Sequence, residues 1–455
     1  MTELMEDTIQ HISNFSRFNQ EAMVNPWIES LRKAAIERFE QVGFPSRTDE
    51  AWRQTNIDPI AKSTFHLPGE VSPADAQSLF DQFTFGNDAV CELVFINGRF
   101  SPELSKQDEL PKGVRLANLA DKILAECTAV QEHLGQFAKI EENPFVALNT
   151  GFINEGAFLH IPRGKTVDRP IHLLFLSIPG EEKTISHPRV LVIADDNAEA
   201  TVVESYIGST GTYFTNAVTE IIAGKDSRID HCKLQQESLE AYHVATMQVQ
   251  LDRAAVFVSH SANIGSKLTR NDLNVVLNGE FADATLNGVV LANGTQHIDN
   301  HTLLDHAAPN CPSHELYKHV LNGKSTGVFR GKIFVRQIAQ KTDSKQTSKC
   351  LLLTDDATML SQPALEIYAD DVKCTHGSTT GPVDDDMVFY LRSRGVGLEA
   401  SRHLLTYAFA ADVTRRIKVE PVRRRLENYM AAQHGLPQDL RITDLGSHDD
   451  SARNM

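Results

Sequence analysis

From about residue 151 the chain consists of short apolar runs of β-like residues separated by polar turns, without a convincing helical pattern for about two hundred residues. Polar turns followed by small and apolar residues begin at Asp195, Lys225, Asp252 and Asn278, at intervals of roughly 27 to 30 residues. Such a period is typical of a solenoid, in which stacked coils bury one continuous core. The pattern predicts a parallel β-helix, although the period alone is almost equally compatible with an antiparallel sandwich.

The N-terminal part carries a different pattern. Trp27, Leu31, Ala35 and Phe39 recur at intervals of four, which places them on one face of a helix. A strand-like run at residues 92–98 and helical stretches such as residues 116–137 follow. Residues 1–150 are therefore predicted to form an α-rich region of their own.

Helical spacing returns near the C-terminus. Leu405, Phe409, Val413 and Ile417 recur at intervals of four, and Pro421 suits the first turn of a second helix at residues 422–432. We predict four parts: an α-rich region at 1–150, a β-helix core at 151–385, a helical region at 386–440 and a disordered tail at 441–455.

Composition narrows the class of protein. The formal charge of −16 disfavours nucleic-acid binding, because phosphate contacts need clustered Lys and Arg. There is no run of 18 apolar residues and no signal-peptide pattern at the start, which predicts neither membrane spanning nor export. Six cysteines without a Cys-x-x-Cys pair indicate reduced thiols. The cytoplasm is the expected compartment.

Cys374 and His376 form the candidate chemical site. They lie two positions apart in a strand-like run, and this spacing places both side chains on one face of a strand. A thiolate beside an imidazole suits either a soft-metal site or a nucleophile with its base. The alternative, which spacing alone favours, is that the Cys packs in a core and the His belongs to a turn.

The residues around this pair resemble the C-terminal signature of the SufB/SufD family, whose members build iron–sulfur clusters. The matching residues are Leu365-Glu366-Ile367, Ala369-Asp370-Asp371-Val372, Cys374-Thr375-His376-Gly377, Gly381, Phe389-Tyr390-Leu391 and Ser393-Arg394-Gly395. Weaker matches lie upstream, at Gly331-Lys332-Ile333, Phe95-Ile96-Asn97-Gly98 and Glu50-Ala51-Trp52-Arg53-Gln54-Thr55. The stretch with Trp52 and Thr55 resembles the SufD branch. Lys349 also resembles the SufD branch, because a SufB-type protein has a functional cysteine at that position. Cys350 is one residue away, so its side chain should lie on the opposite face of the strand.

The resemblance implies a right-handed parallel β-helix and a subunit that is not itself an enzyme. It implies a complex with a SufB-type paralogue and a SufC-type ATPase, with a homodimer possible when the partner is missing. His376 would bind iron or a transient, shared iron–sulfur cluster at the interface with the paralogue, and Cys374 is a weaker candidate. The ATPase would dock on the C-terminal helices, where Leu405, Phe409 and Val413 are the candidate contacts; the same stripe can instead close the end of the β-helix.

Two other motifs have weaker claims. His297, His301, His306, Cys311, His314 and His319 lie within a short span, but on strands their side chains would scatter over both faces, so a metal site there is the less favoured interpretation. Gly323-Lys324-Ser325-Thr326 resembles the end of a phosphate-binding loop, yet the earlier glycine is missing and a strand follows, so this chain is not expected to bind ATP.

Three function classes remain open. The first is the cluster-assembly subunit with a ligand at His376, and the second is a purely structural adaptor of the same complex. The third, a carbohydrate-active β-helix enzyme, is disfavoured because it would need carboxylate clusters and usually secretion. The sequence does not identify the iron donor, the sulfur donor, the cluster type or a flavin.

Overall fold

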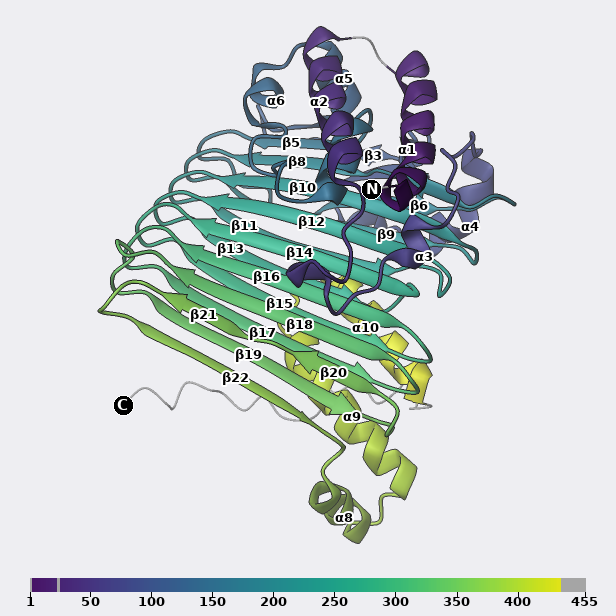
Figure 1. Cartoon of the computed structure of the whole chain (residues 1–455). Coiled ribbons are helices and arrows are strands. Elements are labelled where there is room, and N and C mark those ends of the chain that lie inside the picture. The colour runs from purple at the N-terminus through teal and green to yellow at the C-terminus, as the bar shows by residue number, and fades with distance from the viewer. Residues whose placement is uncertain (1, 23–24, 435–455) are drawn as a thin grey trace. The chain divides into compact units, whose positions relative to one another are not determined.

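A parallel β-solenoid forms the centre of the computed structural model, which describes residues 2–22 and 25–434 (Figure 1). Its strands form two 11-stranded sheets, and from β8 to β20 successive strands of the chain alternate between the sheets. The fold class that the family resemblance implied is confirmed, and the antiparallel sandwich is excluded: the protein is mainly β, with helices in the N-terminal region and at the C-terminal end.

The first sheet contains β1 (Cys91–Ile96), β2 (Arg99–Phe100), β3 (Lys106–Gln107), β6 (Ile171–Ser177), β9 (Glu199–Gly208), β11 (Arg228–Gln236), β13 (Val256–Asn263), β15 (Asp283–Ala292), β17 (Pro312–Leu321), β19 (Asp343–Leu352) and β22 (Lys373–Gly381). The second contains β4 (Arg115–Asn118), β5 (Ala157–Ile161), β7 (Thr184–Ser186), β8 (Arg189–Ala194), β10 (Tyr213–Ala223), β12 (Tyr242–Leu251), β14 (Leu268–Leu277), β16 (His297–His306), β18 (Thr326–Val335), β20 (Thr358–Ser361) and β21 (Ala364–Ile367). From β5 onward the paired strands are parallel.

Each polar turn that repeats in the sequence forms one corner of a solenoid coil. Successive corners place a residue in the left-handed conformation: Asn197, Asp226, Ala254, Phe281, Asn310 and Lys341. The backbone N–H of each donates to a carbonyl of the next corner, as Asn197 does to Lys225 and Asp226 does to Arg253. In-register partners such as Asn271 and Asn300 are 29 residues apart, which agrees with the predicted period.

The N-terminal region packs on the first coils (Figure 1). It contains α1 (Thr2–Glu21), α2 (Pro26–Val42), η1 (Glu50–Trp52), α3 (Asp58–Ala61), α4 (Pro73–Phe83), η2 (Gly86–Asp88), α5 (Leu119–Leu124), α6 (Thr128–His133) and α7 (Pro144–Gly151). The predicted α2 face is present, since Ala35 and Phe39 are fully buried. The stretch 116–137 is less helical than predicted: it begins in β4, and Glu126, with φ 49°, separates two short helices.

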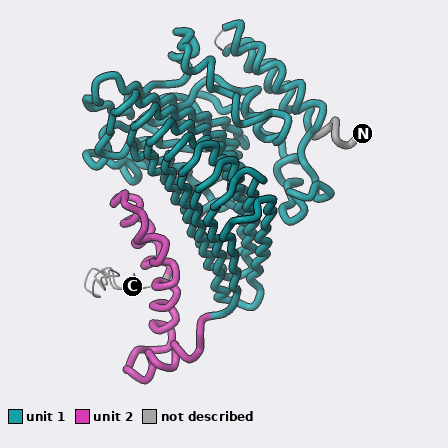
Figure 2. Tube along the Cα trace, turned by 90° about the vertical axis from the view of Figure 1, so that its left-hand side faces the viewer, with its two compact units in different colours: residues 1–382 teal, residues 383–455 magenta. Residues whose placement is uncertain are grey.

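The C-terminal helices belong to a second compact unit, residues 383–455, drawn in magenta in Figure 2. They are α8 (Asp385–Ser393), α9 (Leu398–Thr414) and α10 (Glu420–His434). Pro421 stands in the first turn of α10, as predicted. The apolar stripe was predicted to run along one helix from Leu405 to Ile417. The helix is shorter than that: α9 ends at Thr414, and Ile417 lies in the connection to α10. The predicted tail at 441–455 lies outside the described residues.

Candidate functional site

The last solenoid strand carries both residues of the predicted chemical site. β22 pairs in parallel with β19, which sets Cys374 beside Ser344 and His376 beside Gln346. β22 is also the terminal strand of its sheet, and among residues 2–22 and 25–434 no strand pairs with its other edge. An open strand edge offers backbone N–H and C=O groups to another chain.

Cys374 and His376 differ in exposure. The His376 side chain is exposed to solvent, whereas Cys374 is half-buried and packs against the apolar interior. Burial raises the pKa of the Cys374 thiol, which disfavours the thiolate that would bind a metal. His376 is therefore the more available ligand of the two.

A polar pair lies inside the solenoid in the two strands before His376. Gln346, on β19, is 1% exposed and donates from Nε2 to Glu315 on β17 over 2.6 Å. Burial raises the pKa of Glu315 to about 7. Gly331, from one of the family-like stretches, makes room for this pair, since a Cβ there would lie 2.2 Å from Gln346 Nε2.

Hydrogen-bonding groups also lie beneath Cys374. The Ser344 hydroxyl is 2.7 Å from that of Ser313, and Ser313 is in turn hydrogen-bonded to His306 Nε2 at 2.9 Å. All three are buried. Two polar rows inside the last coils thus end at Cys374 and at His376 respectively.

The substitution at the SufB-type cysteine position has the geometry that the sequence predicted. Lys349 is exposed, whereas Cys350 is buried on the opposite face of β19. Burial raises the pKa of Cys350 to about 12, so this thiol is a packing residue.

The histidine-rich span does not gather into a site. His301 faces outward on β16, while His306 and His319 are buried in the solenoid interior. In the part of the chain that the structure describes, no group of three His, Cys, Asp or Glu residues is arranged to hold a metal ion. Gly323 lies in the turn between β17 and β18, without a following helix, as expected for a segment that is not a phosphate-binding loop.

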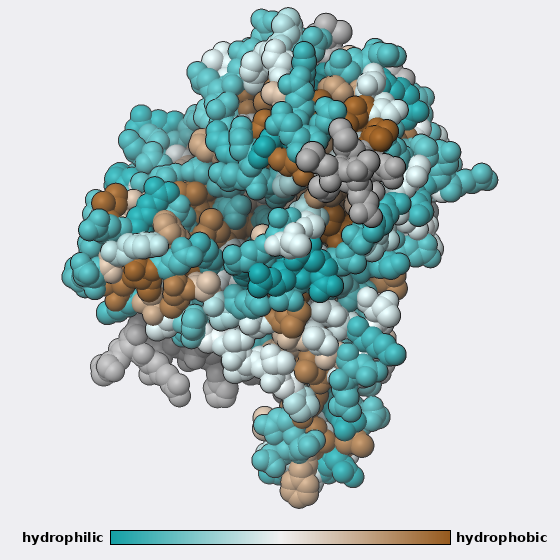
Figure 3. All heavy atoms as spheres, in the orientation of Figure 1, coloured by the Kyte–Doolittle hydropathy of each residue, from teal (hydrophilic) through white to brown (hydrophobic). Residues whose placement is uncertain are grey.

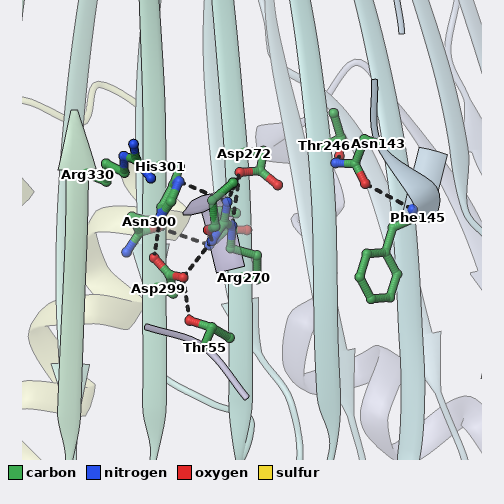
Figure 4. A network of polar contacts seen from close by, with 12 residues as sticks. Thr55, Asn143, Phe145, Thr246, Arg270, Asp272, Asp299, Asn300, His301 and Arg330 are labelled. Carbon is green, nitrogen blue, oxygen red and sulfur yellow. Dashed lines mark hydrogen bonds and ion pairs between the residues drawn. The ribbon is translucent and has the colours of Figure 1, made fainter. Parts of the chain in front are cut away.

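A buried ionic network was not predicted from the sequence. Arg270 Nη1 lies 2.7 Å from Asp299, its Nη2 lies 2.7 Å from Asp272, and its guanidinium is 4.5 Å from the centre of the Trp52 ring (Figure 4). Thr55 donates its hydroxyl to Asp299. The neighbouring positive charge holds the pKa of Asp299 below its usual range despite burial. The network holds the Trp52–Thr55 segment against the solenoid. Thr55 and Asp299 are 244 residues apart in the chain, so the spacing of nearby residues could not predict their contact.

The predicted docking helix presents less apolar surface than its sequence suggested. Leu405 and Phe409 are half-buried, and Val413 is 1% exposed. The exposed apolar side chains of this unit lie instead mainly on α8, where Phe389 is 72% and Tyr390 is 54% exposed.

These features define a class: a β-solenoid preceded and followed in the chain by helices, whose last strand presents an imidazole beside an open edge. Comparison with known families then gives the identity. Residues 5–173 match the SufBD protein N-terminal region, and residues 176–409 match the SufBD core domain of the SUF system for FeS cluster assembly. The chain belongs to the SufBD family of iron–sulfur cluster assembly proteins.

Individual relatives support the SufD branch. The chain is 31% identical to the iron–sulfur cluster assembly protein SufD of Escherichia coli over 395 residues, covering 86% of this chain and 89% of that protein. It is 30% identical to a SufBD family protein of Synechocystis over 429 residues, covering 91% and 94%. Identity to SufB of Bacillus subtilis is 24% over 430 residues, covering 91% and 90%.

All six cysteines are free thiols. None of the helices in the described ranges combines the length and apolarity needed to cross a bilayer.

Proposed function

We propose that this chain is the SufD-type subunit of a cytoplasmic SUF complex, and that it contributes His376 as a ligand to a nascent iron–sulfur cluster shared with a SufB-type paralogue. The observation that carries this proposal is the position of His376: exposed, on the terminal strand, beside an edge open to a second chain. Two solenoids that pair by such edges would bring their last strands together.

The chemistry of imidazole suits a transient cargo. A histidine can replace a thiolate at iron, and the site then carries less negative charge than an all-cysteine site. Thiolates of the paralogue would supply the remaining ligands. Cys374 is a secondary ligand at most in this proposal, because burial raises the pKa of its thiol.

The chain itself performs no catalysis in this proposal. Its phosphate-loop-like segment is a turn between strands, so ATP hydrolysis would belong to a SufC-type subunit. We place the dock for that ATPase on the C-terminal helices. Phe389 and Tyr390 of α8 join Leu405 and Phe409 of α9 as contact residues, because their apolar side chains are exposed or half-buried.

The proposal is tested by measuring iron and acid-labile sulfide in the complex co-expressed with both partners. His376→Ala is expected to lose most of the cluster while the subunits still co-purify. His314→Ala is the matched control, because His314 is exposed on β17 and remote in sequence from the terminal strand. Unchanged cluster in the His376→Ala complex would reduce the chain to a structural adaptor, the competing function.

The ATPase dock is tested separately, by co-purification of the ATPase subunit. Phe389→Ser with Tyr390→Ser is expected to weaken ATPase binding and to change the thermal midpoint of the isolated chain little, since both side chains are already in water. Undiminished ATPase binding by this double variant would exclude α8 from the dock.

A further inference from the structure

A cavity of about 520 Å³ lies in the N-terminal half of the molecule, far in sequence from the last strand. Its walls come from the second half of α1, residues 67–69, the turn after β1, residues 152–155 and residues 185–187. In Figure 3 hydrophobic residues (brown) are exposed among hydrophilic ones (teal) in the upper part of the view, where Figure 1 places the N-terminal helices. The proposed cluster chemistry uses none of these residues.

Part of the cavity wall is flat and apolar. The rings of Phe18 and Phe152 are 5.2 Å apart, and His187 stacks on Phe152 with its ring centre at 4.5 Å and an interplanar angle of 9°. The two phenylalanine rings are tilted by 50° to one another, and Phe152 is 4% exposed, so the half-buried Phe18 ring is the more accessible of the two to an apolar group.

The charged groups at the cavity are mostly positive. Arg17 is exposed and has no ion-pair partner among the described residues. Arg99 forms an ion pair with Glu70 at 3.5 Å, and the Glu70 side chain is 91% exposed, so water screens that pair; the Arg99 charge also acts on the Glu155 carboxyl. The one carboxyl in the wall, Glu155, accepts the N–H of Phe100; burial raises its pKa, and the Phe100 N–H and the Arg99 charge oppose that rise.

The turn that carries Arg99 is held in place. The Asn97 side chain donates to the carbonyl of Ile178 at 2.9 Å and accepts the Ile178 N–H at 2.7 Å. Gly98 has φ +83°, and a Cβ there would lie 3.3 Å from Ser186. Arg99 is thus presented by a fixed backbone, which lowers the entropy cost of binding.

His187 lies in the cavity wall, with its Nε2 atom buried. Asn216 donates to its Nδ1, so the ring proton resides on Nε2, which has no hydrogen-bond partner within the described part of the chain. Burial lowers the pKa of His187 to about 3, which keeps the ring neutral. The cavity therefore presents two exposed guanidinium groups and one carboxyl beside aromatic side chains, which gives its wall a net positive charge.

We propose that this cavity binds a small organic anion with a flat, apolar body. Its charged group contacts Arg17 and Arg99, and its body lies against Phe18 and Phe152. The proposal is independent of the function proposed for His376.

The test uses the full chain and the fluorescent aromatic sulfonate 8-anilinonaphthalene-1-sulfonate, with its uncharged analogue N-phenyl-1-naphthylamine as the comparison. Arg17→Gln with Arg99→Gln is expected to raise the Kd for the sulfonate about tenfold and leave the Kd for the neutral analogue unchanged, because charge-assisted hydrogen bonds are lost. Both arginines are exposed, so the double variant should keep the thermal midpoint of the wild type.

Arg115→Gln with Arg163→Gln is the matched control, because it removes the same charge from exposed positions outside the cavity. It should bind the sulfonate as the wild type does, and 1-naphthoate should displace the sulfonate from both. The proposal is overturned if the cavity and control variants bind the sulfonate equally well, or if the neutral analogue weakens in parallel, because binding would then be hydrophobic or depend on net charge only.

Discussion

The middle and the last coils of the solenoid share one backbone register but treat buried polar groups differently. In the middle coils the interior charges are well partnered. Glu204 accepts hydrogen bonds from Tyr206 and Thr219, and Lys233 donates to His243 and Asn271 at 2.9 and 2.6 Å. In the last coils neither ring nitrogen of His319 has a hydrogen-bond partner among the residues described.

This difference separates two uses of buried polarity. Buried acids and bases that pair with one another specify how coils stack, whereas buried titratable groups without a charged partner cost stability. In the last coils Glu315 has a neutral partner, Gln346, and His319 has none among the residues described; His376 lies at that end of the solenoid. The comparison predicts that polar groups of the middle coils stabilise the fold and that those of the last coils do not.

The largest expected effect is from Lys233→Met. Burial already lowers the pKa of Lys233 to about 8, and removal of the cation would leave Glu204 and Glu237 buried without it. A loss of about 3 to 5 kcal/mol in the free energy of unfolding is expected, measured by urea titration. Lys332→Met, which breaks a half-exposed pair with Glu366, should cost less than about 1 kcal/mol. If both substitutions lowered the free energy of unfolding equally, the difference between the middle and the last coils would not hold.

Glu315→Gln should stabilise the protein at pH 8 by about 2 to 3 kcal/mol. The folded pKa of Glu315 is raised to about 7 from 4.5, so the folded state holds its proton between these values while the unfolded state has lost it. Stability consequently falls as pH rises through this window, and glutamine removes that loss. Wild type and variant should converge near pH 4.5 in urea titrations. A destabilised variant at pH 8 would show that Glu315 is a structural anchor.

His319→Leu is expected to have the smallest effect at neutral pH, within about 1 kcal/mol. Burial lowers the folded pKa of His319 to about 4 from 6.5, so the unfolded state binds a proton first as pH falls below 6.5. The wild type should therefore lose about 2 kcal/mol at pH 5 from this residue, and the variant should not. Thermal midpoints at pH 7.5 and pH 5 measure the difference. If both proteins had the same acid sensitivity, His319 would not be held neutral by burial.

The repeat was readable in the sequence because each coil needs a corner. Asn197, Asp226 and Asn310 are residue types that tolerate the left-handed conformation, and they precede small residues that turn inward. The strand carrying Cys374 and His376 was also readable, since a spacing of two fixes a shared face. Neither inference needed contacts distant in sequence.

Other features could not be predicted from the sequence, because they depend on contacts between residues that are distant in the chain. The Arg270 network joins Thr55 to Asp299, and the need for glycine at 331 arises from Gln346 on another strand. Burial of Val413 likewise depends on packing that helical spacing does not specify. The roles of His376, Cys374, Leu405 and Phe409 stay predictions, because they concern partners.

The most direct test of the account is nitrogen hyperfine spectroscopy of the reduced cluster in the three-subunit complex, with ¹⁵N-histidine incorporated only into this chain. The account predicts a coordinated-imidazole coupling that changes with the label, disappears in His376→Ala and persists in His314→Ala. A cluster whose spectrum is unaffected both by the label and by His376→Ala would contradict it.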